Sequence, residues 1–265
     1  MRNQARHFFT RGWCQFTFDP VLFGWVNATL ASARATVQDP QQQKWLRYQK
    51  TWFAGVNALP NDSQGATAES GPLRGKAIDF IAGQLKLEHF AWDRAQVSVC
   101  YPGYPQPMAG ESPGKARYRR ERDAAHVDGL LPEGPERRRH LREYHGFILG
   151  IPMVEFDANA SPFVVWEGSH EIMRNAFAQR FAGIQPEKWG EQDVTEVYHA
   201  AREQVFGACE RREIHTRPGE ALLAHRLVLH GMAPWRNHAV ADADGRMICY
   251  FRPDSFGPYE WLNNP

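Results

Sequence analysis

The chain has 265 residues and is close to electrically neutral, with 31 Lys and Arg against 30 Asp and Glu. This balance gives no reason to expect a nucleic acid or an anionic membrane as partner. The length suits one catalytic domain. We expect a single unit over 1–265, with a helical support region at 1–94 and a barrel core at 95–265 that carries insertions at 102–125 and 181–217.

The ends of the chain and its thiols bear on where the protein works. The N-terminus lacks the apolar stretch of a signal peptide, and no run approaches membrane-spanning length. The four cysteines show no Cys-x-x-Cys spacing, which is typical of reduced thiols. We therefore expect a cytoplasmic protein without a membrane or nucleic-acid partner. The sequence leaves the oligomeric state open.

Helical patterns dominate the first third of the chain. Asp19 precedes a proline and a run of apolar residues at helical spacing, which predicts an N-capped helix over Pro20–Val37. Further helices are expected over Gln41–Phe53 and Leu73–Leu85. Asn57–Leu73, rich in Pro, Asn, Ser and Gly, is expected to be a loop. These helices should pack on the outside of the barrel.

Strand patterns replace helical ones from about Ala95, so the fold class is expected to be mainly β with supporting α. The expected strands are Gln96–Tyr101, Gly146–Met153, Phe163–Trp166, Ala221–Leu229 and Met247–Phe251. The long insertion Pro102–Ala125 carries Pro and Gly and is of the kind that covers an active site. In the second insertion, Asp193–Ala208 is expected to be a helix with Asp193 as its cap.

A His-x-Asp motif, His126-Val127-Asp128, suits a metal ion. Side chains at i and i+2 of an extended strand point to the same side, so one segment can supply two neighbouring ligands. A third ligand must then come from another strand, which a barrel brings alongside. Two imidazoles and one carboxylate can occupy one face of Fe(II) and leave the opposite positions open.

The order of motifs along the chain is more specific than any one motif. In chain order the motifs are His126-x-Asp128, Gly168-Ser169-His170, Pro218-Gly219-Glu220, His230-Gly231 and Gly245-Arg246. This order, over about Val97–Phe251, resembles the phytanoyl-CoA dioxygenase family of Fe(II)/2-oxoglutarate oxygenases.

The resemblance implies a double-stranded β-helix, a jelly-roll or cupin-like barrel, flanked by the N-terminal helices. It makes His126, Asp128 and His230 the iron ligands. Arg246 becomes the partner of the C5 carboxylate of 2-oxoglutarate, a role that suits the planar and permanently charged guanidinium. Tyr101 matches a position near the co-substrate in the family and could hydrogen-bond it.

The implied activity is that of an oxidoreductase. Iron, 2-oxoglutarate and O2 would hydroxylate a small-molecule substrate, with release of succinate and CO2. Related halogenases replace the carboxylate ligand with a small residue, so Asp128 favours an oxygenation. Two other classes remain as alternatives: a divalent-metal hydrolase or isomerase on the same barrel, and a non-catalytic small-molecule binding module.

Three residues are alternatives to the assigned ones. The turn before Arg246 is longer than is usual in the family, so Arg236 remains a second candidate for the co-substrate anchor. His225 is the rival third ligand, although a regular strand would point it away from the face that carries His230. His170 is expected to have a structural role where a strand ends and a loop begins.

Two basic clusters flank the metal motif. They are Lys115, Arg117, Arg119, Arg120 and Arg122 on one side and Arg137, Arg138, Arg139 and Arg142 on the other. One interpretation is an electropositive rim that captures an anionic substrate. The other is an ion-paired loop surface, because acidic residues are interspersed among the basic ones.

Overall fold

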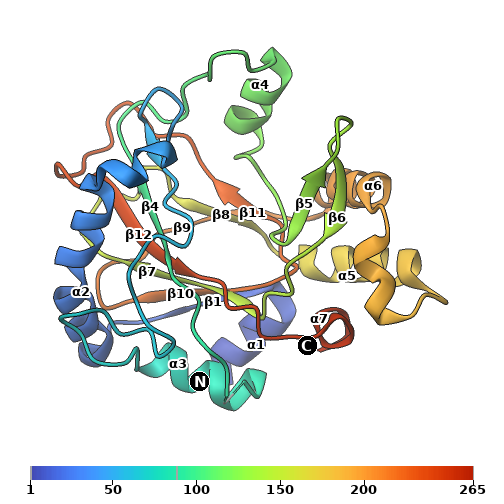
Figure 1. The fold of residues 1–265 in the computed structure, drawn as a ribbon, viewed down its shortest axis with the longest axis horizontal. Helices are drawn as coiled ribbons and strands as arrows, with labels where there is room; N and C mark the ends of the chain where they lie inside the picture. The colour runs from blue at the N-terminus through green and yellow to red at the C-terminus, as the bar shows by residue number, and fades with distance from the viewer. Residues whose placement is uncertain (1, 88, 265) are drawn as a thin grey trace.

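The computed structural model describes residues 2–87 and 89–264, which form two antiparallel sheets flanked by helices (Figure 1). The large sheet has the strand order β1-β10-β7-β12-β4-β3-β2. Its strands are β1 (Trp13–Phe16), β10 (Ala221–His225), β7 (Phe147–Pro152), β12 (Arg246–Phe251), β4 (Gln96–Cys100), β3 (Trp52–Phe53) and β2 (Leu46–Arg47).

The small sheet has the order β11-β8-β9. Its strands are β11 (His230–Met232), β8 (Phe163–Trp166) and β9 (Arg211–Ile214). A β-bridge between His126 and His230 lays the His-x-Asp segment beside β11. The strands β5 (Leu130–Glu133) and β6 (Arg138–Leu141) form a separate hairpin.

The two sheets face each other across a shared core. The ring of Phe163 on β8 lies 5.8 Å from the ring of Tyr250 on β12, so the inner faces of the sheets are in contact. The alternate residues of β8, Val164 and Trp166, belong to a second apolar cluster on the outer face of the small sheet. This alternation is the period of two that an extended strand imposes.

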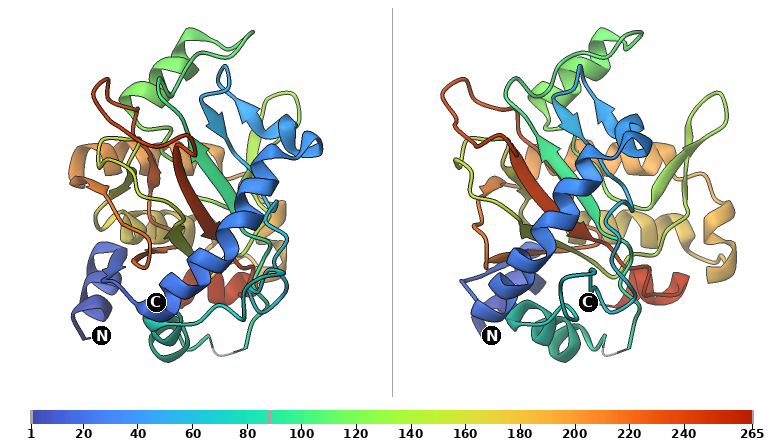
Figure 2. Two further views of the ribbon diagram at one scale, coloured as in Figure 1. Left: turned by 90° about the vertical axis from the view of Figure 1, so that its left-hand side faces the viewer. Right: turned by 60° about the vertical axis from the view of Figure 1, so that its left-hand side comes forward.

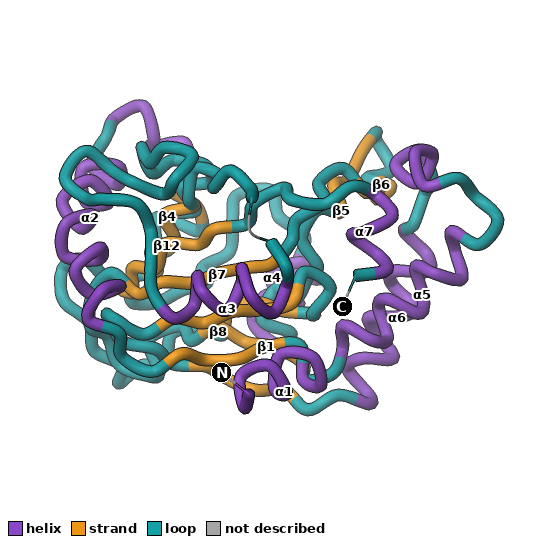
Figure 3. Tube along the Cα trace, turned by 90° about the horizontal axis from the view of Figure 1, so that it is seen from below, coloured by secondary structure: helices purple, strands orange, loops and turns teal. Residues whose placement is uncertain are grey.

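Helices cover the outer faces of both sheets. The long helix α2 (Pro20–Gln38) crosses the large sheet (Figure 2), where Trp25 packs on Phe251 at 5.9 Å. The helices α5 (Ser169–Phe181) and α6 (Thr195–Ala208) lie side by side at the right of Figure 3, and their apolar residues share a cluster with Val164 and Trp166 of the small sheet. The remaining helices are α1 (Arg2–Arg11), α3 (Lys76–Leu85), α4 (Pro113–Glu121) and α7 (Pro258–Asn263), with 3-10 helices η1 (Pro40–Trp45) and η2 (Pro186–Glu191).

The predicted cap of the first long helix is confirmed. Asp19 accepts a hydrogen bond at Oδ1 from the Val21 amide, at 3.0 Å. Its other oxygen accepts from the amide of Lys76, at 2.7 Å, where α3 begins. One carboxylate therefore satisfies amides at the starts of two helices, which is why α3 begins after Gly75 without a cap of its own.

The predicted helix over Gln41–Phe53 is wrong. The segment starts as the short helix η1 and then forms the β2–β3 hairpin, whose turn residues Tyr48, Gln49 and Lys50 all have positive φ. Pairing of this hairpin with β4 extends the large sheet and outweighs the helical spacing of its apolar residues. Together with β1, the hairpin shows that region 1–94 contributes strands to the large sheet as well as helices.

The predicted strand Ala221–Leu229 is interrupted. Strand β10 ends at His225 in the large sheet, and β11 begins at His230 in the small one. The other predicted strands are found to within one or two residues. The sequence patterns did not reveal α1, α4, the β5–β6 hairpin, β9, or the helix α5 that follows Gly168. No helix in 2–87 or 89–264 is both long and apolar enough to cross a membrane.

Candidate metal centre

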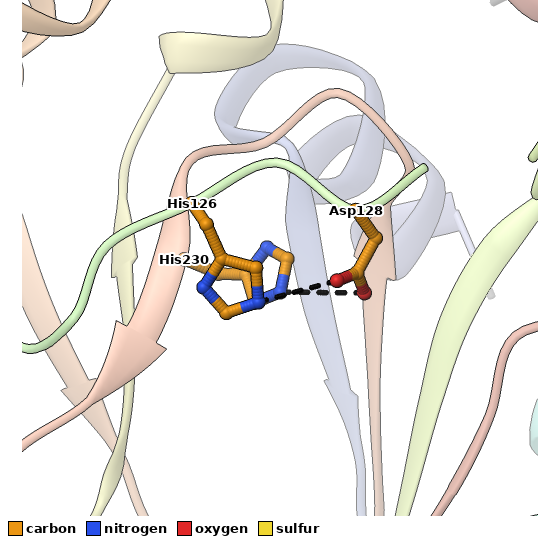
Figure 4. A group of neighbouring side chains, drawn as sticks. All are labelled: His126, Asp128 and His230. Atoms are coloured by element: carbon orange, nitrogen blue, oxygen red, sulfur yellow. Dashed lines mark ion pairs between the residues drawn. The ribbon is translucent and has the colours of Figure 1, made fainter. Parts of the chain in front are cut away.

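His126, Asp128 and His230 converge on one point beside β11 (Figure 4). Their ligand atoms all lie within 4.8 Å of one another. The Nε2 atom of His126 is 3.2 Å from Asp128 Oδ1, and the Nε2 atom of His230 is 3.6 Å from Asp128 Oδ2. Two nitrogens and one carboxylate at this spacing could hold one divalent metal ion.

Strand pairing explains why residues so far apart in sequence meet. His126 and His230 exchange backbone hydrogen bonds of 2.8 and 3.0 Å, which fixes them directly opposite each other. Val127 turns outward into the apolar cluster behind the small sheet, so Asp128 points inward on the same side as His126.

Backbone carbonyls orient both imidazoles. The Nδ1 atom of His126 lies 3.0 Å from the oxygen of Ala124, and that of His230 lies 3.0 Å from the oxygen of Val228. A proton on each Nδ1 would be donated to the carbonyl, which leaves each Nε2 lone pair directed toward the metal position.

Arg252 is a residue of the site that the sequence patterns did not single out. Its guanidinium lies 3.2 Å from Oδ2 of Asp128. Burial alone would raise the pKa of Asp128, but Arg252 and the two histidines outweigh it and hold the pKa well below its ordinary value. Burial, followed by His126, lowers the pKa of His230. Asp128 is therefore held as a carboxylate and His230 as a neutral imidazole, which are the forms that bind metal.

Gly231 allows the two ligand-bearing segments to approach. A Cβ atom added to Gly231 would lie 2.2 Å from the backbone oxygen of Asp123. That oxygen also accepts a 2.8 Å hydrogen bond from the Met232 amide, so it cannot move away freely. The His-Gly pair is thus explained by close packing of the chain that leads to His126.

We expect Gly231→Ala to displace His126 and to weaken metal binding by roughly tenfold or more, as loss of an orienting partner around a metal typically does. Competition titration of the metal-free protein with Co(II) would measure the change. Gly83→Ala is the control, because a Cβ at Gly83 meets nothing within 4 Å. Unchanged affinity in Gly231→Ala would contradict this explanation of the glycine.

A cavity of about 500 Å³ opens beside the metal position. Its size is in the range of small-molecule sites. Aromatic side chains form much of its wall: Tyr48, Trp52, Tyr104 and Phe163. The ring of Phe163 stacks on that of His230 at 5.5 Å and 19°, which supports the ligand from one side.

Arg246 lies buried next to this cavity. It is 1% exposed, and it donates to the hydroxyl of Tyr250 at 2.8 Å. Tyr250 and Met232, its two side-chain partners, both line the cavity. Within 2–87 and 89–264, no carboxylate lies within 4.0 Å of its guanidinium, and its Nε atom has no hydrogen-bond partner. A buried cation in this state suits an anionic ligand.

Arg236, the alternative anchor, lies elsewhere. Its guanidinium forms an ion pair of 2.7 Å with Glu213 and contacts Asn159 at the surface. It already has a carboxylate partner and does not line the cavity. The structure therefore brings Arg246, and not Arg236, to the metal side of the barrel.

Tyr101 does not reach the cavity. Its ring lies over Gly245, and burial followed by the charge of Asp244 raises the pKa of its hydroxyl. Gln96 and Ser98 of β4 line the cavity, and the alternation of side chains along an extended strand directs Tyr101 to the opposite side. After a short turn the chain brings Tyr104 back to the cavity wall, 3% exposed. The alternation of side chains along β4 could therefore have indicated from the sequence that Tyr101 points away from the cavity.

His225 and His170 form a buried pair remote from the metal position. Their rings lie 4.9 Å apart. The Nδ1 atom of His225 accepts from the Leu227 amide at 3.0 Å, and Nε2 of His170 lies 3.2 Å from the oxygen of Phe9. Both have structural roles. His225 is separated from His230 by a change of sheet, and not by the alternation of one regular strand.

This pair predicts acid sensitivity of the fold. Burial, followed by Arg226, holds the pKa of His225 well below its ordinary value, so the folded state disfavours its protonation. The unfolded chain takes up the proton below about pH 6.5, so this stability is present above that pH and is lost as pH falls toward the folded pKa. The melting temperature of the metal-free protein should fall from about pH 7 to about pH 5, and less steeply in His225→Gln. An equal fall of the melting temperature with pH in the wild type and in His225→Gln would contradict the role of His225 in acid sensitivity.

Most of the two basic clusters are surface groups. Lys115, Arg117, Arg120 and Arg137 are exposed. Arg119 pairs with Glu111, Arg138 with Glu196 and Asp193, and Arg142 with Glu133. Arg139 differs, because it lines the cavity. The ion-paired interpretation therefore fits the clusters in general, with Arg139 as the exception.

No model of a protein family matches the chain, and no curated protein matches its sequence. Two solved structures are similar over 96% of this chain and 83% of their own chains. One is the non-heme alpha ketoglutarate dependent carbocyclase SnoK from nogalamycin biosynthesis, at 12% identity and a TM-score of 0.50. The other is the epimerase SnoN in complex with Fe3+, alpha ketoglutarate and nogalamycin RO, at 13% identity and a TM-score of 0.51. At these identities the likeness establishes a shared fold.

Proposed function

We propose that this protein is a non-haem Fe(II)/2-oxoglutarate-dependent oxygenase whose two sheets form a double-stranded β-helix. The single observation that carries the proposal is the buried Arg246. It lies beside a cavity that also holds a His-Asp-His metal centre, and it has no carboxylate partner in the described part of the chain. A hydrolase on the same three ligands has no need of such a cation. The resemblance to the phytanoyl-CoA dioxygenase family and the shared fold with SnoK and SnoN support the same proposal.

The residues present fit iron and 2-oxoglutarate. Two imidazole nitrogens and one carboxylate would hold Fe(II) on one face and leave other positions for a chelating co-substrate and for O2. The guanidinium of Arg246 would bind the far carboxylate bidentately, beside the hydroxyl of Tyr250. Tyr104 takes the co-substrate role that Tyr101 was expected to have, because its ring lines the cavity.

When bound, iron and 2-oxoglutarate supply the oxidising chemistry, with succinate and CO2 as co-products. The chain supplies position and charge. Arg252 holds the second oxygen of Asp128, so the carboxylate keeps one orientation toward the metal. Phe163 stacks on His230, and the aromatic residues of the wall give the cavity an apolar surface beside the reacting centre. Retention of Asp128 favours hydroxylation of a small-molecule substrate over halogenation.

An anaerobic titration tests this function. Fe(II) is added to the metal-free protein, then 2-oxoglutarate, and the visible metal-to-ligand charge-transfer absorption is followed. We expect saturable absorption and, after exposure to O2, formation of succinate. Metal binding without any response to 2-oxoglutarate would refute the proposal and favour the hydrolase or isomerase alternative. Absence of metal binding would favour a non-catalytic binding module.

A further inference from the structure

The charges that line the cavity do not balance. Its charged lining residues are Arg47, Asp123, Asp128, Arg139 and Arg252. Asp128 is a metal ligand and pairs with Arg252 at 3.2 Å. Asp123 is neutralised from outside the lining, because Arg211 donates to both of its oxygens at 2.7 and 2.8 Å. The charged lining residues that remain to be accounted for are Arg47 and Arg139.

Neither of these two arginines has a carboxylate partner within 4.0 Å in the described residues 2–87 and 89–264. Arg139 donates to the oxygen of Leu130 at 2.8 Å and lies 5.3 Å from the ring of Tyr198, so its position is fixed while other donors of its guanidinium remain available. Arg138, beside it on β6, is instead paired with two carboxylates. The unpaired charge on this strand is therefore the one that faces the cavity.

Arg47 reaches the cavity from the other hairpin. It lies on β2, half-buried, 5.3 Å from the ring of Trp45. In Figure 1 the blue β2–β3 hairpin, at the upper left, and the green β5–β6 hairpin, at the right, stand apart. Two guanidinium groups from separate hairpins thus border one cavity, an arrangement that attracts an anion and suits bidentate contacts.

One part of the cavity wall is aromatic. The rings of Tyr48 and Trp52 are stacked at 5.7 Å and 5°, and Tyr104 meets both edge-on at 6.0 and 6.3 Å. The indole nitrogen of Trp52 already donates to Ser98, at 3.0 Å, and the guanidinium of Arg119 lies 3.7 Å from the centre of the Tyr48 ring, so Trp52 and Tyr104 are the rings that a ligand would meet. A flat apolar group would pack against such a surface.

We infer that the primary substrate is a small anion with a flat apolar body, whose carboxylate or phosphate is attracted into the cavity by Arg47 and Arg139 while its body lies against Trp52 and Tyr104. The inference depends on the proposed function only for the reaction that the bound substrate then undergoes. The binding site itself is distinct from Arg246, which would hold the co-substrate.

Calorimetric titration with 2-naphthoate and its neutral analogue 2-naphthamide tests the inference. The protein is loaded with Zn(II) and saturated with 2-oxoglutarate, so that neither the metal nor Arg246 is free for the probe. We expect naphthoate to bind roughly tenfold tighter than the amide, the size of one charge-assisted hydrogen bond. Arg47→Gln and Arg139→Gln should each reduce this preference, and Lys at either position should restore part of it.

Arg138→Gln is the matched control, since it removes a neighbouring charge from the same strand but not from the cavity. Its preference should equal that of the wild type. Equal binding of the two probes, binding of neither, or a preference that persists in the Arg47→Gln/Arg139→Gln double variant would overturn the inference. Loss of preference only in Arg246→Gln would also overturn it.

Failure of the proposed function is recognised separately. If 2-oxoglutarate does not bind, the same probes are titrated into the metal-free protein. A preference for naphthoate that depends on Arg47 and Arg139 would then support the anion site even though the oxygenase proposal had failed.

Discussion

Replacing Arg246 with alanine is expected to raise the Kd of the Fe(II)-loaded protein for 2-oxoglutarate by roughly a hundredfold or more. Removal of one partner from a buried ion pair costs on the order of 3–5 kcal/mol, because the remaining charge stays buried without compensation. Through the affinity relation this energy corresponds to at least about two orders of magnitude. The measurement is the anaerobic titration followed by charge-transfer absorption. Iron affinity should change little, since Arg246 is not a ligand.

The control is Arg236→Ala, which removes an exposed guanidinium that is already paired with Glu213. It should bind 2-oxoglutarate as the wild type does. Arg246→Lys should recover part of the loss by keeping the charge without the planar fork. If Arg236→Ala weakens binding and Arg246→Ala does not, the wrong arginine has been assigned. If neither does, the 2-oxoglutarate assignment fails.

The convergence of His126 and Asp128 on one side of the chain could be predicted because it depends on short-range geometry. The spacing of His126 and Asp128 is the period of a strand, and any extended backbone directs both to one side. The same parity could have revealed more. Arg246, Ile248 and Tyr250 alternate along β12, and Arg252 follows directly after the strand in the same alternation, so an inward Arg246 indicates an inward Arg252, the partner of Asp128.

The remainder of the site depends on pairing between distant segments. Arg47 falls in a stretch whose apolar spacing fits a helix, and only its pairing beside β4 makes it part of a hairpin that borders the cavity. Likewise, nothing local distinguishes Arg139 from Arg138. One faces the cavity and the other faces Asp193, because of where β6 lies against α6.

The function of the two basic clusters could not be predicted from the sequence for a similar reason. Composition alone could not separate a substrate-binding rim from an ion-paired surface, since both contain arginines among carboxylates. The structure distinguishes the two by their interaction partners. Arg142 forms an ion pair with Glu133, whereas Arg139 donates to a backbone oxygen and lies over an aromatic ring. A guanidinium without a carboxylate, beside a cavity, is the one available to a ligand.

Asp128→Ala is expected to abolish hydroxylation through loss of iron. Loss of a residue that merely orients a ligand costs about 10- to 100-fold in metal affinity, so removal of the carboxylate ligand itself should exceed the upper end of that range. Arg252 adds to the effect, because it would lose its Asp128 partner and direct its positive charge toward the metal position. Iron content after desalting, a competition titration with Co(II), and succinate formation together measure the outcome.

Asp128→Asn separates charge from shape, since it keeps the size of the side chain and one oxygen. We expect it to bind metal more weakly than the wild type yet to melt closer to it than Asp128→Ala does. Asp244→Ala is the control: it removes a carboxylate that pairs with Arg34 at the surface, at 2.7 Å, and should retain iron fully. Ordinary succinate formation by Asp128→Ala with stoichiometric iron would show that Asp128 is not a ligand. A second carboxylate would then have to complete the centre, and Asp123, the other acidic residue lining the cavity, would have to release Arg211 to do so.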